Sequence, residues 1–342
     1  MKRSFCTCFD HNYLIYGLTL FESLKTYMQD FELYVLCLSV EVYQKLHGLA
    51  PEIIPVPLQA LEDFVPELMS CKNDRSRTEY IFTLSPLLPL YLFSKYSNLK
   101  QLAYLDSDLY FFASPESLFE KMADRSLFIT SHRFSIMAEK REALYGKYNV
   151  AFQIYRNDAV GIACLTQWKK QCLDWCYDRA ENGKFADQKY LDTWPEQWHD
   201  SVVVASCPGI NDALWNIGKT AFQKTSAGIF SDGNPLIFFH FQGFKQLAPH
   251  IALWPQEEDY RTNIKFINFF AKVYLKALIA VQKKYSFLFD YKISIPVRFF
   301  EERLKFTRME KFISWIPGKK LQLFLRVIYF CLRNRNAIFF KF

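Results

Sequence analysis

The amino-acid sequence predicts an α/β fold in which a sheet is flanked by helices. Short apolar runs alternate with amphipathic segments along the first part of the chain, and the last quarter becomes helical, basic and aromatic. Of the 342 residues, 51% are hydrophobic and 18% are aromatic, so a sizeable core can form. We expect an α/β domain over residues 1–256 and a helical, basic extension over residues 257–342.

The individual elements follow from apolar periodicity and from the turn residues between them. Strands that alternate with helices at this spacing form parallel β-α-β units. Pro86 and Pro89 must kink or split the long apolar segment over 78–96, because proline lacks an amide hydrogen. The predicted strands cover 4–9, 31–38, 53–56, 101–105, 128–131, 151–155 and 235–241, and the predicted helices cover 14–27, 40–46, 78–96 and 162–179.

Charge divides the chain unevenly. Residues 261–342 contain 18 Lys and Arg against four Asp and Glu, and because the whole chain carries +7, the remainder carries −7. Aromatic side chains mixed with Lys and Arg over 311–342 are typical of segments that meet an anionic membrane surface. The alternative is that these helices pack on the preceding domain and expose a solvated basic face. Nucleic-acid binding is not expected, because no recognised module accompanies the charge.

The cysteines and the N-terminus indicate the compartment. Nine cysteines, with no C-x-x-C spacing, argue against a disulfide framework and against a zinc site. No apolar stretch is long and uncharged enough for a membrane span, and the N-terminus lacks the pattern of a secretory signal. We expect a cytoplasmic protein, with peripheral attachment to the cytoplasmic face of the inner membrane as a further hypothesis.

Asp106 and Asp108 are the first candidates for chemistry. They follow the predicted strand 101–105, and ligands of open α/β sheets bind outside the carboxyl ends of strands. Two carboxylates separated by one residue can face a single hard cation such as Mg²⁺ or Mn²⁺. A solvated acidic turn is the alternative. The apolar neighbours on both sides disfavour it, because two carboxylates in such a setting repel each other unless a cation joins them.

Six segments together resemble those of the GT-A-fold glycosyltransferases, especially family 8 and its bacterial relatives. The metal-binding segment of that family is similar to YLDSDLYF over 104–111. The other five segments occur in the family's order and extend the resemblance over about residues 4–250. They are TCFDHNYL over 7–14, GKYNVAF over 146–152, FADQKYLD over 185–192, NDALWN over 211–216 and FHFQGFK over 239–245.

The resemblance implies a Rossmann-like mixed sheet of the GT-A type flanked by helices, and it implies roles for individual residues. Asp106, Asp108 and His240 would hold Mn²⁺ or Mg²⁺, while Asp187 and Gln188 would lie near the anomeric carbon as catalytic residues. Contacts to the nucleotide or to the donor sugar are implied for Thr7, Asp10, Tyr13, Ser107, Asn149, Gly243 and Lys245. From the residues alone, His240 could equally be a hydrogen-bonded core residue, and Asp187 could belong to the first turn of a helix.

The sequence departs from the family pattern in two places. Lys245 follows Gly243 after one residue where the family has two, and Phe82 occupies the position of a family arginine. Arg75 or Arg77, from the preceding loop, could supply the missing charge, and we take Arg77 as the donor-binding residue. The segment 132–134 could point into the cleft or form a structural salt bridge, while Trp194 and Trp215 suit the core or an acceptor platform better than catalysis.

The activity that the resemblance implies is a metal-dependent glycosyltransferase of the hexosyltransferase type. It would move a sugar, with retention of configuration, from a nucleotide donor such as a UDP-sugar to a glycan or lipid-linked glycan of the lipopolysaccharide or capsule kind. Two alternatives remain. One is a non-catalytic, membrane-associated relative in cell-surface glycan assembly, and the other is a nucleotidyl- or phosphotransferase that uses the same carboxylates.

Overall fold

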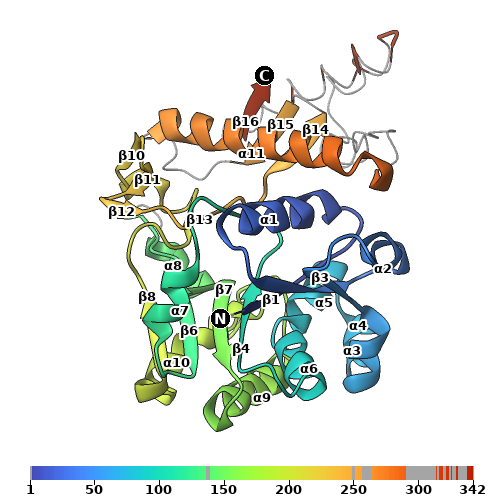
Figure 1. The fold of residues 1–342 in the computed structure, drawn as a ribbon, viewed down its shortest axis with the longest axis vertical. Coiled ribbons are helices and arrows are strands. Elements are labelled where there is room, and N and C mark those ends of the chain that lie inside the picture. The colour runs from blue at the N-terminus through green and yellow to red at the C-terminus, as the bar shows by residue number, and fades with distance from the viewer. Residues whose placement is uncertain are drawn as a thin grey trace. The chain divides into compact units, whose positions relative to one another are not determined.

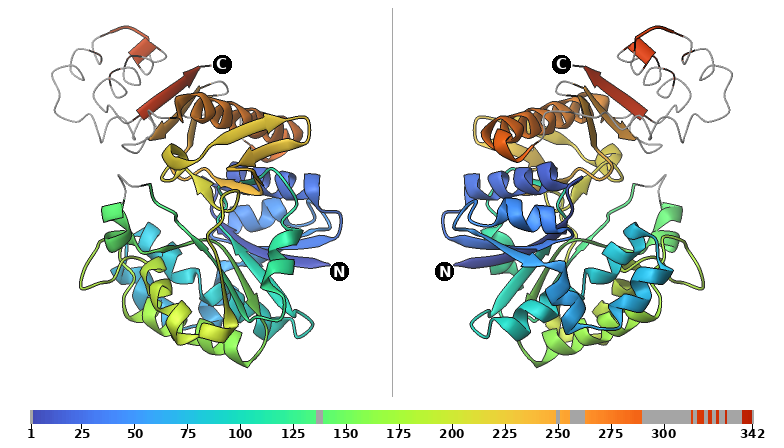
Figure 2. Two further views of the ribbon diagram at one scale, coloured as in Figure 1. Left: turned by 90° about the vertical axis from the view of Figure 1, so that its left-hand side faces the viewer. Right: turned by 90° about the vertical axis from the view of Figure 1, so that its right-hand side faces the viewer.

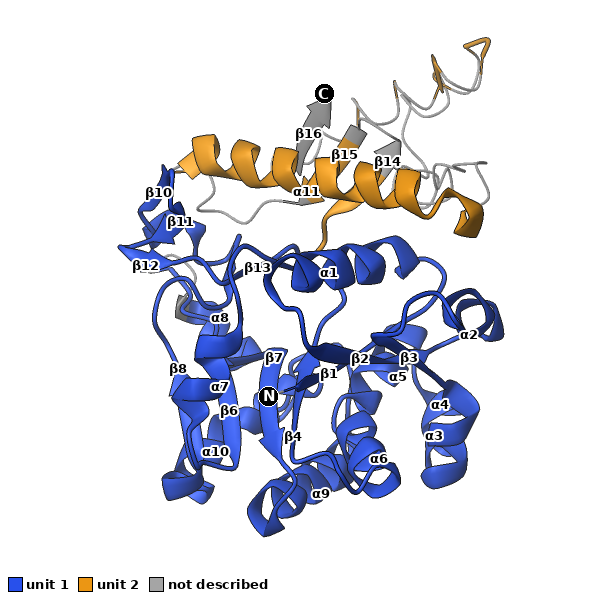
Figure 3. Cartoon of the chain, in the orientation of Figure 1, with its two compact units in different colours: residues 1–241 blue, residues 242–342 orange. Residues whose placement is uncertain are grey.

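A computed structural model describes residues 2–135, 139–248, 251–255, 263–289 and 337–341, together with isolated positions between 313 and 329. The chain divides into two compact units, residues 1–241 and residues 242–342, which Figure 3 distinguishes by colour. Each unit is described separately below. The basic segment 311–336 lies outside the described residues except for the isolated positions.

A seven-stranded mixed sheet forms the centre of unit 1, with strand order β3-β2-β1-β4-β7-β6-β8 (Figure 1). The neighbours β3, β2, β1 and β4 run parallel, β7 is antiparallel to both β4 and β6, and β8 is parallel to β6. This arrangement confirms the predicted mixed α/β class. The strands are β1 (Arg3–Phe9), β2 (Phe31–Cys37), β3 (Ile53–Pro57), β4 (Gln101–Leu105), β6 (Leu127–Ser131), β7 (Tyr148–Arg156) and β8 (Val202–Ala205).

Helices cover both faces of this sheet, as the side views in Figure 2 show. On one face, Phe5 of β1 packs edge-to-face against Phe119 of α7 and against Phe31, which also contacts Phe21 of α1. On the other face, the side chains of α3, α4, α5, α6 and α9 form a continuous buried cluster with those of the strands. The α-helices of unit 1 are α1 (Leu14–Tyr27), α2 (Val40–Leu46), α3 (Leu58–Phe64), α4 (Leu68–Asp74), α5 (Arg77–Leu84), α6 (Leu87–Lys95), α7 (Glu116–Met122), α8 (Glu139–Tyr145), α9 (Ala159–Asp174) and α10 (Trp194–Gln197).

Local sequence explains where several helices begin and end. The Ser76 hydroxyl and the Glu79 carboxylate form a capping box at the start of α5, and the Asp158 carboxylate accepts from the Gly161 amide at the start of α9. The predicted segment 78–96 is split between α5 and α6 beside Pro86, whereas Pro89 lies in the first turn of α6, where its missing amide hydrogen costs nothing. The predicted end of α9 at residue 179 is wrong, because the backbone becomes extended at Trp175.

Two small sheets complete unit 1. One has the order β5-β13-β9 and the other the order β10-β11-β12. The predicted strand 235–241 is therefore divided between two sheets, and it is not the last strand of the chain. The elements are β5 (Leu109–Phe111), β9 (Asp212–Ala213), β10 (Phe222–Thr225), β11 (Gly228–Ser231), β12 (Asn234–Pro235) and β13 (Phe238–His240), with short 3-10 turns η2 (Gln188–Thr193), η3 (His199–Ser201) and η4 (Ile217–Lys219).

Unit 2 combines strands with one long helix. Strands β14 (Lys245–Ala248), β15 (Ile251–Pro255) and β16 (Ala337–Lys341) form an antiparallel sheet, and α11 (Ile264–Lys284) is followed by η6 (Ser286–Leu288). The helix buries an apolar stripe that includes Ile267, Phe270 and Tyr274. Within the part of the chain that the structure describes, no helix is long and apolar enough to cross a bilayer.

Candidate functional site

The predicted site residues of unit 1 gather at one edge of the seven-stranded sheet. The strand order 3-2-1-4 changes direction between β1 and β4, and in open α/β sheets ligands bind at such a switch point, outside the carboxyl ends of the strands. Asp10 follows β1 and Asp106 follows β4 at this edge. Asn149 is the second residue of strand β7. It lies at the same edge, because β7 pairs with β4 in the opposite direction.

Asp106, Asp108 and His240 form a compact cluster here. The His240 Nε2 atom lies 3.0 Å from Asp108 Oδ1 and 3.8 Å from Asp106 Oδ2, and one ligand atom from each residue lies within 4.8 Å of the others. Pairing between β13 and β5 creates this proximity, since His240 is opposite Leu109 and the Phe241 amide donates to the Asp108 carbonyl at 3.0 Å. The cluster therefore depends on a long-range strand pair as well as on the local D-x-D spacing.

The charges within the cluster constrain one another. Removal of water from around Asp106 raises its pKa to about 6; the His240 charge opposes this rise and the Asp108 carboxylate adds to it. Burial alone would lower the pKa of His240, but the two carboxylates outweigh burial and raise it. Two carboxylates and an imidazole nitrogen are ligands that Mn²⁺ and Mg²⁺ accept, so the donor set fits a divalent cation.

Asp10 and Arg77 form an ion pair at the neighbouring position on the sheet edge. The guanidinium donates to Asp10 Oδ2 at 2.7 and 3.1 Å, and Asp10 Oδ1 accepts from the Asn12 amide at 2.9 Å. Burial of Asp10 acts to raise its pKa, but Arg77 and Asn12 outweigh it and hold the pKa below its ordinary value. Tyr13 immediately precedes α1 beside this pair; the residue is 43% exposed, and its ring is tilted against that of Tyr16.

The structure distinguishes the two arginines that the sequence left open. Arg75 is buried, and its guanidinium donates to the carbonyls of Cys172 and Leu173 in the last turn of α9 at 2.7 and 2.6 Å. Arg77, by contrast, has a side chain that is 59% exposed. Arg75 therefore caps a helix end, whereas Arg77 lies at the edge that also carries Asp10. Both arginines line a cavity of about 380 Å³, together with Leu38, Leu58, Lys72, Tyr80 and Ile81.

Asn149 and Gln188 lie next to each other at the start of β7. The Asn149 Nδ2 atom is 3.4 Å from Gln188 Oε1, and Gln188 Nε2 donates to the Tyr145 carbonyl at 2.9 Å. Asp187 is buried beside them, and burial raises its pKa to about 7, against an opposing hydrogen bond from Ser85. The backbone carbonyl of Asp187 accepts from the Trp168 indole at 2.8 Å, which anchors this turn to α9.

The remaining predicted residues occupy varied environments. Thr7 lies within β1 and has no exposed surface, while Ser107 is a buried residue between the two aspartates. Gly243, with a φ of +75°, and Lys245, the first residue of β14, belong to unit 2. Trp194 is a core residue, packed edge-to-face on Trp168. Arg133 forms a buried ion pair with Asp212. Of the two alternatives for the segment 132–134, Arg133 therefore follows the structural salt bridge.

His132 belongs to the segment 132–134, for which the sequence left a cleft position and a structural role both open, and it was not among the predicted site residues. It follows β6 and is 4% exposed, and its Nε2 atom lies 3.1 Å from Asn149 Nδ2. Trp215 joins it to the cluster: the Trp215 indole donates to the His132 carbonyl at 2.8 Å and packs perpendicular to the His240 ring at 5.2 Å. A histidine after a buried strand whose end faces the same edge was the available signal.

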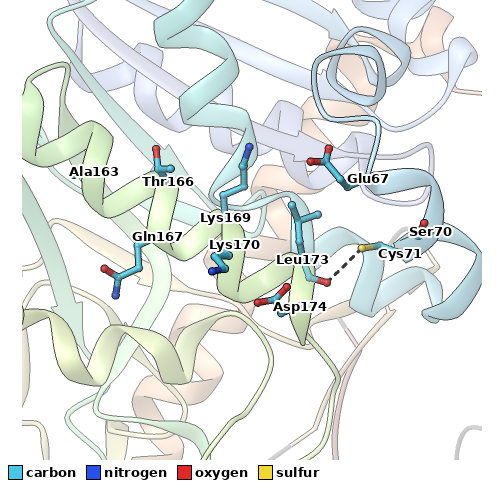
Figure 4. A pocket seen from close by; sticks show the side chains of 10 residues that line it. All are labelled: Glu67, Ser70, Cys71, Ala163, Thr166, Gln167, Lys169, Lys170, Leu173 and Asp174. Atoms are coloured by element: carbon cyan, nitrogen blue, oxygen red, sulfur yellow. Dashed lines mark hydrogen bonds between the residues drawn. The ribbon is translucent and has the colours of Figure 1, made fainter.

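A separate groove of about 920 Å³ lies between α4 and α9 (Figure 4). Its walls include Glu67, Cys71, Lys169 and Lys170, and Cys71 Sγ donates to the Leu173 carbonyl. No predicted site residue lines it, so its volume alone does not make it the functional site. The cysteines among the described residues are all free thiols.

Fold and site together define an α/β protein with a carboxylate–imidazole cluster suited to a divalent cation. No protein-family model matches the chain. Two proteins of Bacillus subtilis strain 168 are similar to it, and neither name states an activity. YfnF is 31% identical over 276 residues, covering 78% of this chain and 90% of YfnF, and YfnD is 32% identical over 243 residues, covering 70% and 77%. The chain belongs to the protein family of YfnF and YfnD.

Among solved structures, similarity extends to proteins named as glycosyltransferases. A galactosyltransferase LgtC, in complex with donor and acceptor sugar analogues, has a TM-score of 0.47 and 14% identity, covering 79% of this chain and 95% of LgtC. Mouse xyloside xylosyltransferase 1, without ligand, has a TM-score of 0.42 and 13% identity, covering 62% and 88%.

Proposed function

We propose that the protein is a metal-dependent glycosyltransferase of the GT-A type. It transfers a hexose from a nucleoside diphosphate donor, a UDP-sugar, to a glycan or lipid-linked glycan. The observation that carries this proposal is the convergence of Asp106, Asp108 and His240 at the edge of the sheet where ligands of α/β folds bind.

The cluster would hold Mn²⁺ or Mg²⁺. A bound divalent cation supplies positive charge that stabilises a departing diphosphate. The raised pKa of Asp106 supports this assignment, because the carboxylate lacks full compensation from protein groups alone. Ser107 is the residue between Asp106 and Asp108, and we assign it a contact with the nucleotide-sugar donor that the metal would bind.

Nucleoside binding is assigned to the other half of the edge. Tyr13 offers a half-exposed ring for stacking on the base, and Asp10 and Arg77 offer a carboxylate and a guanidinium next to a cavity of about 380 Å³. Further donor contacts are assigned, on the sequence resemblance, to Thr7, Gly243 and Lys245.

Sugar binding is assigned to Asn149, Gln188 and Asp187. The acceptor hydroxyl oxygen forms a bond to the sugar C1 as the bond from C1 to the diphosphate oxygen breaks, and the hydroxyl proton passes to the leaving phosphate. The Gln188 amide is a poor nucleophile, which favours this front-face route and retention of configuration over a covalent intermediate.

The acceptor is assigned to the glycans built at the cytoplasmic face of the inner membrane, as in lipopolysaccharide or capsule assembly. The basic, aromatic composition of 257–342 supports peripheral attachment to anionic lipid. Vesicles with and without anionic lipid, incubated with the full chain, test this part of the proposal.

The decisive experiment measures turnover of a panel of nucleotide sugars with Mn²⁺, with and without a chelator. Release of nucleoside diphosphate that stops with the chelator and in both Asp106→Asn and Asp108→Asn is the expected result. Full turnover in both variants would overturn the proposal. Release of pyrophosphate instead would identify a nucleotidyltransferase.

A further inference from the structure

His132 shares a hydrogen-bonded network with the residues assigned to the donor sugar. The imidazole Nε2 atom and the Asn149 Nδ2 atom are 3.1 Å apart, and Asn149 Nδ2 also approaches Gln188 Oε1 at 3.4 Å. His132, Asn149 and Gln188 therefore form a chain of three side chains at the sheet edge. Two backbone groups determine how Asn149 and Gln188 are oriented.

The orientation of the Asn149 amide is fixed by β7. The Ala151 backbone amide donates to Asn149 Oδ1 at 3.1 Å, so the oxygen of the side chain faces the strand and the NH₂ group faces His132. At the other end, Gln188 Nε2 donates to the Tyr145 carbonyl, which turns Gln188 Oε1 towards Asn149. Asn149 is thus the donor to both neighbours, and His132 Nε2 must be the acceptor.

The imidazole can accept because it is neutral. Burial, with a smaller contribution from the nearby His240 charge, lowers the pKa of His132 to about 3. The proton of the neutral ring is then on Nδ1, leaving the Nε2 lone pair for Asn149.

Rigid packing holds the ring in this orientation. His132 stacks on Phe134 with ring centres 4.6 Å apart and planes 12° apart, and it meets Trp215 edge-on at 5.4 Å. The His132 carbonyl accepts from the Trp215 indole and from Asn216 Nδ2 at 2.8 and 2.9 Å. Both the ring and its backbone are therefore located by independent contacts.

We infer that His132 is a positioning residue for the donor sugar, whose Nε2 lone pair aims the Asn149 side-chain amide and, through it, Gln188. The inference rests on the proposed function. His132 has no assigned contact with the donor and acts only through Asn149. Its loss should reduce kcat in the transfer reaction while leaving the affinity for the sugar-free nucleoside diphosphate unchanged, because that product lacks the group that Asn149 contacts.

Two substitutions of His132 separate the acceptor from the bulk of the ring. His132→Leu removes the acceptor and should lower kcat roughly 10- to 100-fold, the usual effect of losing a residue that orients a ligating or contacting group. His132→Gln places an amide oxygen near the former Nε2 and should recover at least part of that loss. His199→Leu, at a side chain that is 82% exposed, is the control and should match the wild type.

A double-mutant cycle with Asn149→Ala tests whether His132 acts through Asn149. The double variant His132→Leu/Asn149→Ala should be no slower than Asn149→Ala alone. Equal losses in His132→Leu and His132→Gln, wild-type kcat in His132→Leu, or losses that multiply in the cycle would each overturn the inference while leaving the proposed function intact. If the leucine variant does not fold, the same cycle with His132→Ala, which also removes the acceptor, gives the answer. A wild-type protein that turns over no nucleotide sugar would overturn the proposed function and this inference together.

Discussion

Arg77, at the first position of α5, forms an ion pair with Asp10, the residue that follows β1, with 2.7 Å between Nη2 and Oδ2. The pair connects two segments that are far apart in sequence at the edge of the sheet assigned to the nucleoside. Arg75, two residues earlier, instead binds the carbonyls at the end of α9. The two arginines thus provide a matched comparison between binding and stability.

Replacing each arginine by methionine should give opposite results. Arg77→Met should weaken binding of a nucleoside diphosphate about tenfold, because a charged hydrogen bond at the binding edge is lost, and should change stability little. Arg75→Met should lower the free energy of unfolding by about 2 kcal/mol and leave binding unchanged, because buried carbonyls lose a charged donor. Isothermal titration calorimetry and urea unfolding measure the two effects. An exchange of the two outcomes would show that the roles are reversed.

Divalent metal should stabilise the protein through the cluster of Asp106, Asp108 and His240. Mn²⁺ at about 100 times its dissociation constant should raise the free energy of unfolding by about 2.7 kcal/mol, because the ion binds only the folded state. His240→Ala should abolish this stabilisation, as should Asp106→Asn. Asp124→Asn, at a carboxylate that is 96% exposed, is the matched control and should respond like the wild type. An undiminished thermal shift in His240→Ala would contradict ligation by this histidine.

Asp187 should make stability depend on pH. Its pKa rises from 3.8 to about 7 on folding, so between about pH 4 and pH 7 the folded state keeps a proton that the unfolded state releases. The stabilising contribution is complete below about pH 4 and is lost as the pH rises through 7. Asparagine cannot titrate, so Asp187→Asn should gain stability over the wild type between pH 5 and pH 8, on the order of 2–3 kcal/mol.

Urea unfolding of the wild type and of Asp187→Asn at pH 5 and pH 8 measures this effect. In the difference between their unfolding free energies, the pH dependence of the carboxylates that both proteins share cancels. Asp63→Asn, at an exposed position of α3, should show no such change. A difference between Asp187→Asn and the wild type that is independent of pH would mean that Asp187 is ionised in the folded protein throughout this range.

Gly209 should be intolerant of a side chain. Its φ is +90°, and a Cβ atom there would lie 2.3 Å from the Pro235 carbonyl oxygen, a backbone atom that cannot move aside. Gly209→Ala should therefore cost roughly 3 kcal/mol of unfolding free energy. Gly233 has a φ of +78° but open space around it, so Gly233→Ala should cost only about 1 kcal/mol. Equal costs in chemical denaturation would show that the steric contact is relieved.

Sequence periodicity located the elements with strong local patterns. The helix at 14–27 and the strand at 101–105 match the structure, because each has a complete apolar pattern and turn residues at its ends. Strand β5, with three residues, and β9, with two, lacked enough residues to show a period. Helix α9 ended earlier than predicted, and the carbonyls of its last turn are bound by Arg75, a contact that no local pattern contains.

The same distinction between local patterns and tertiary contacts applies to the residues of the candidate site. Asp106 and Asp108 were accessible from local spacing at a strand end, and their placement at the edge of the sheet follows from topology. The approach of His240 depends on the register between β13 and β5, and the role of His132 depends on how Asn149 is oriented by Ala151. Both are tertiary relationships, so only a family resemblance could suggest the first. For the second, the sequence offered only the position of the segment 132–134 after a predicted strand.

Pairing of β13 with β5 also has a consequence for biosynthesis. The two aspartates emerge from the ribosome long before His240, so a nascent chain holds only two of the three cluster residues until the last strand of unit 1 has been made. Binding of a metal by all three residues would then require that β13 has already paired with β5. Chains terminated before residue 240 would carry the two aspartates without the imidazole.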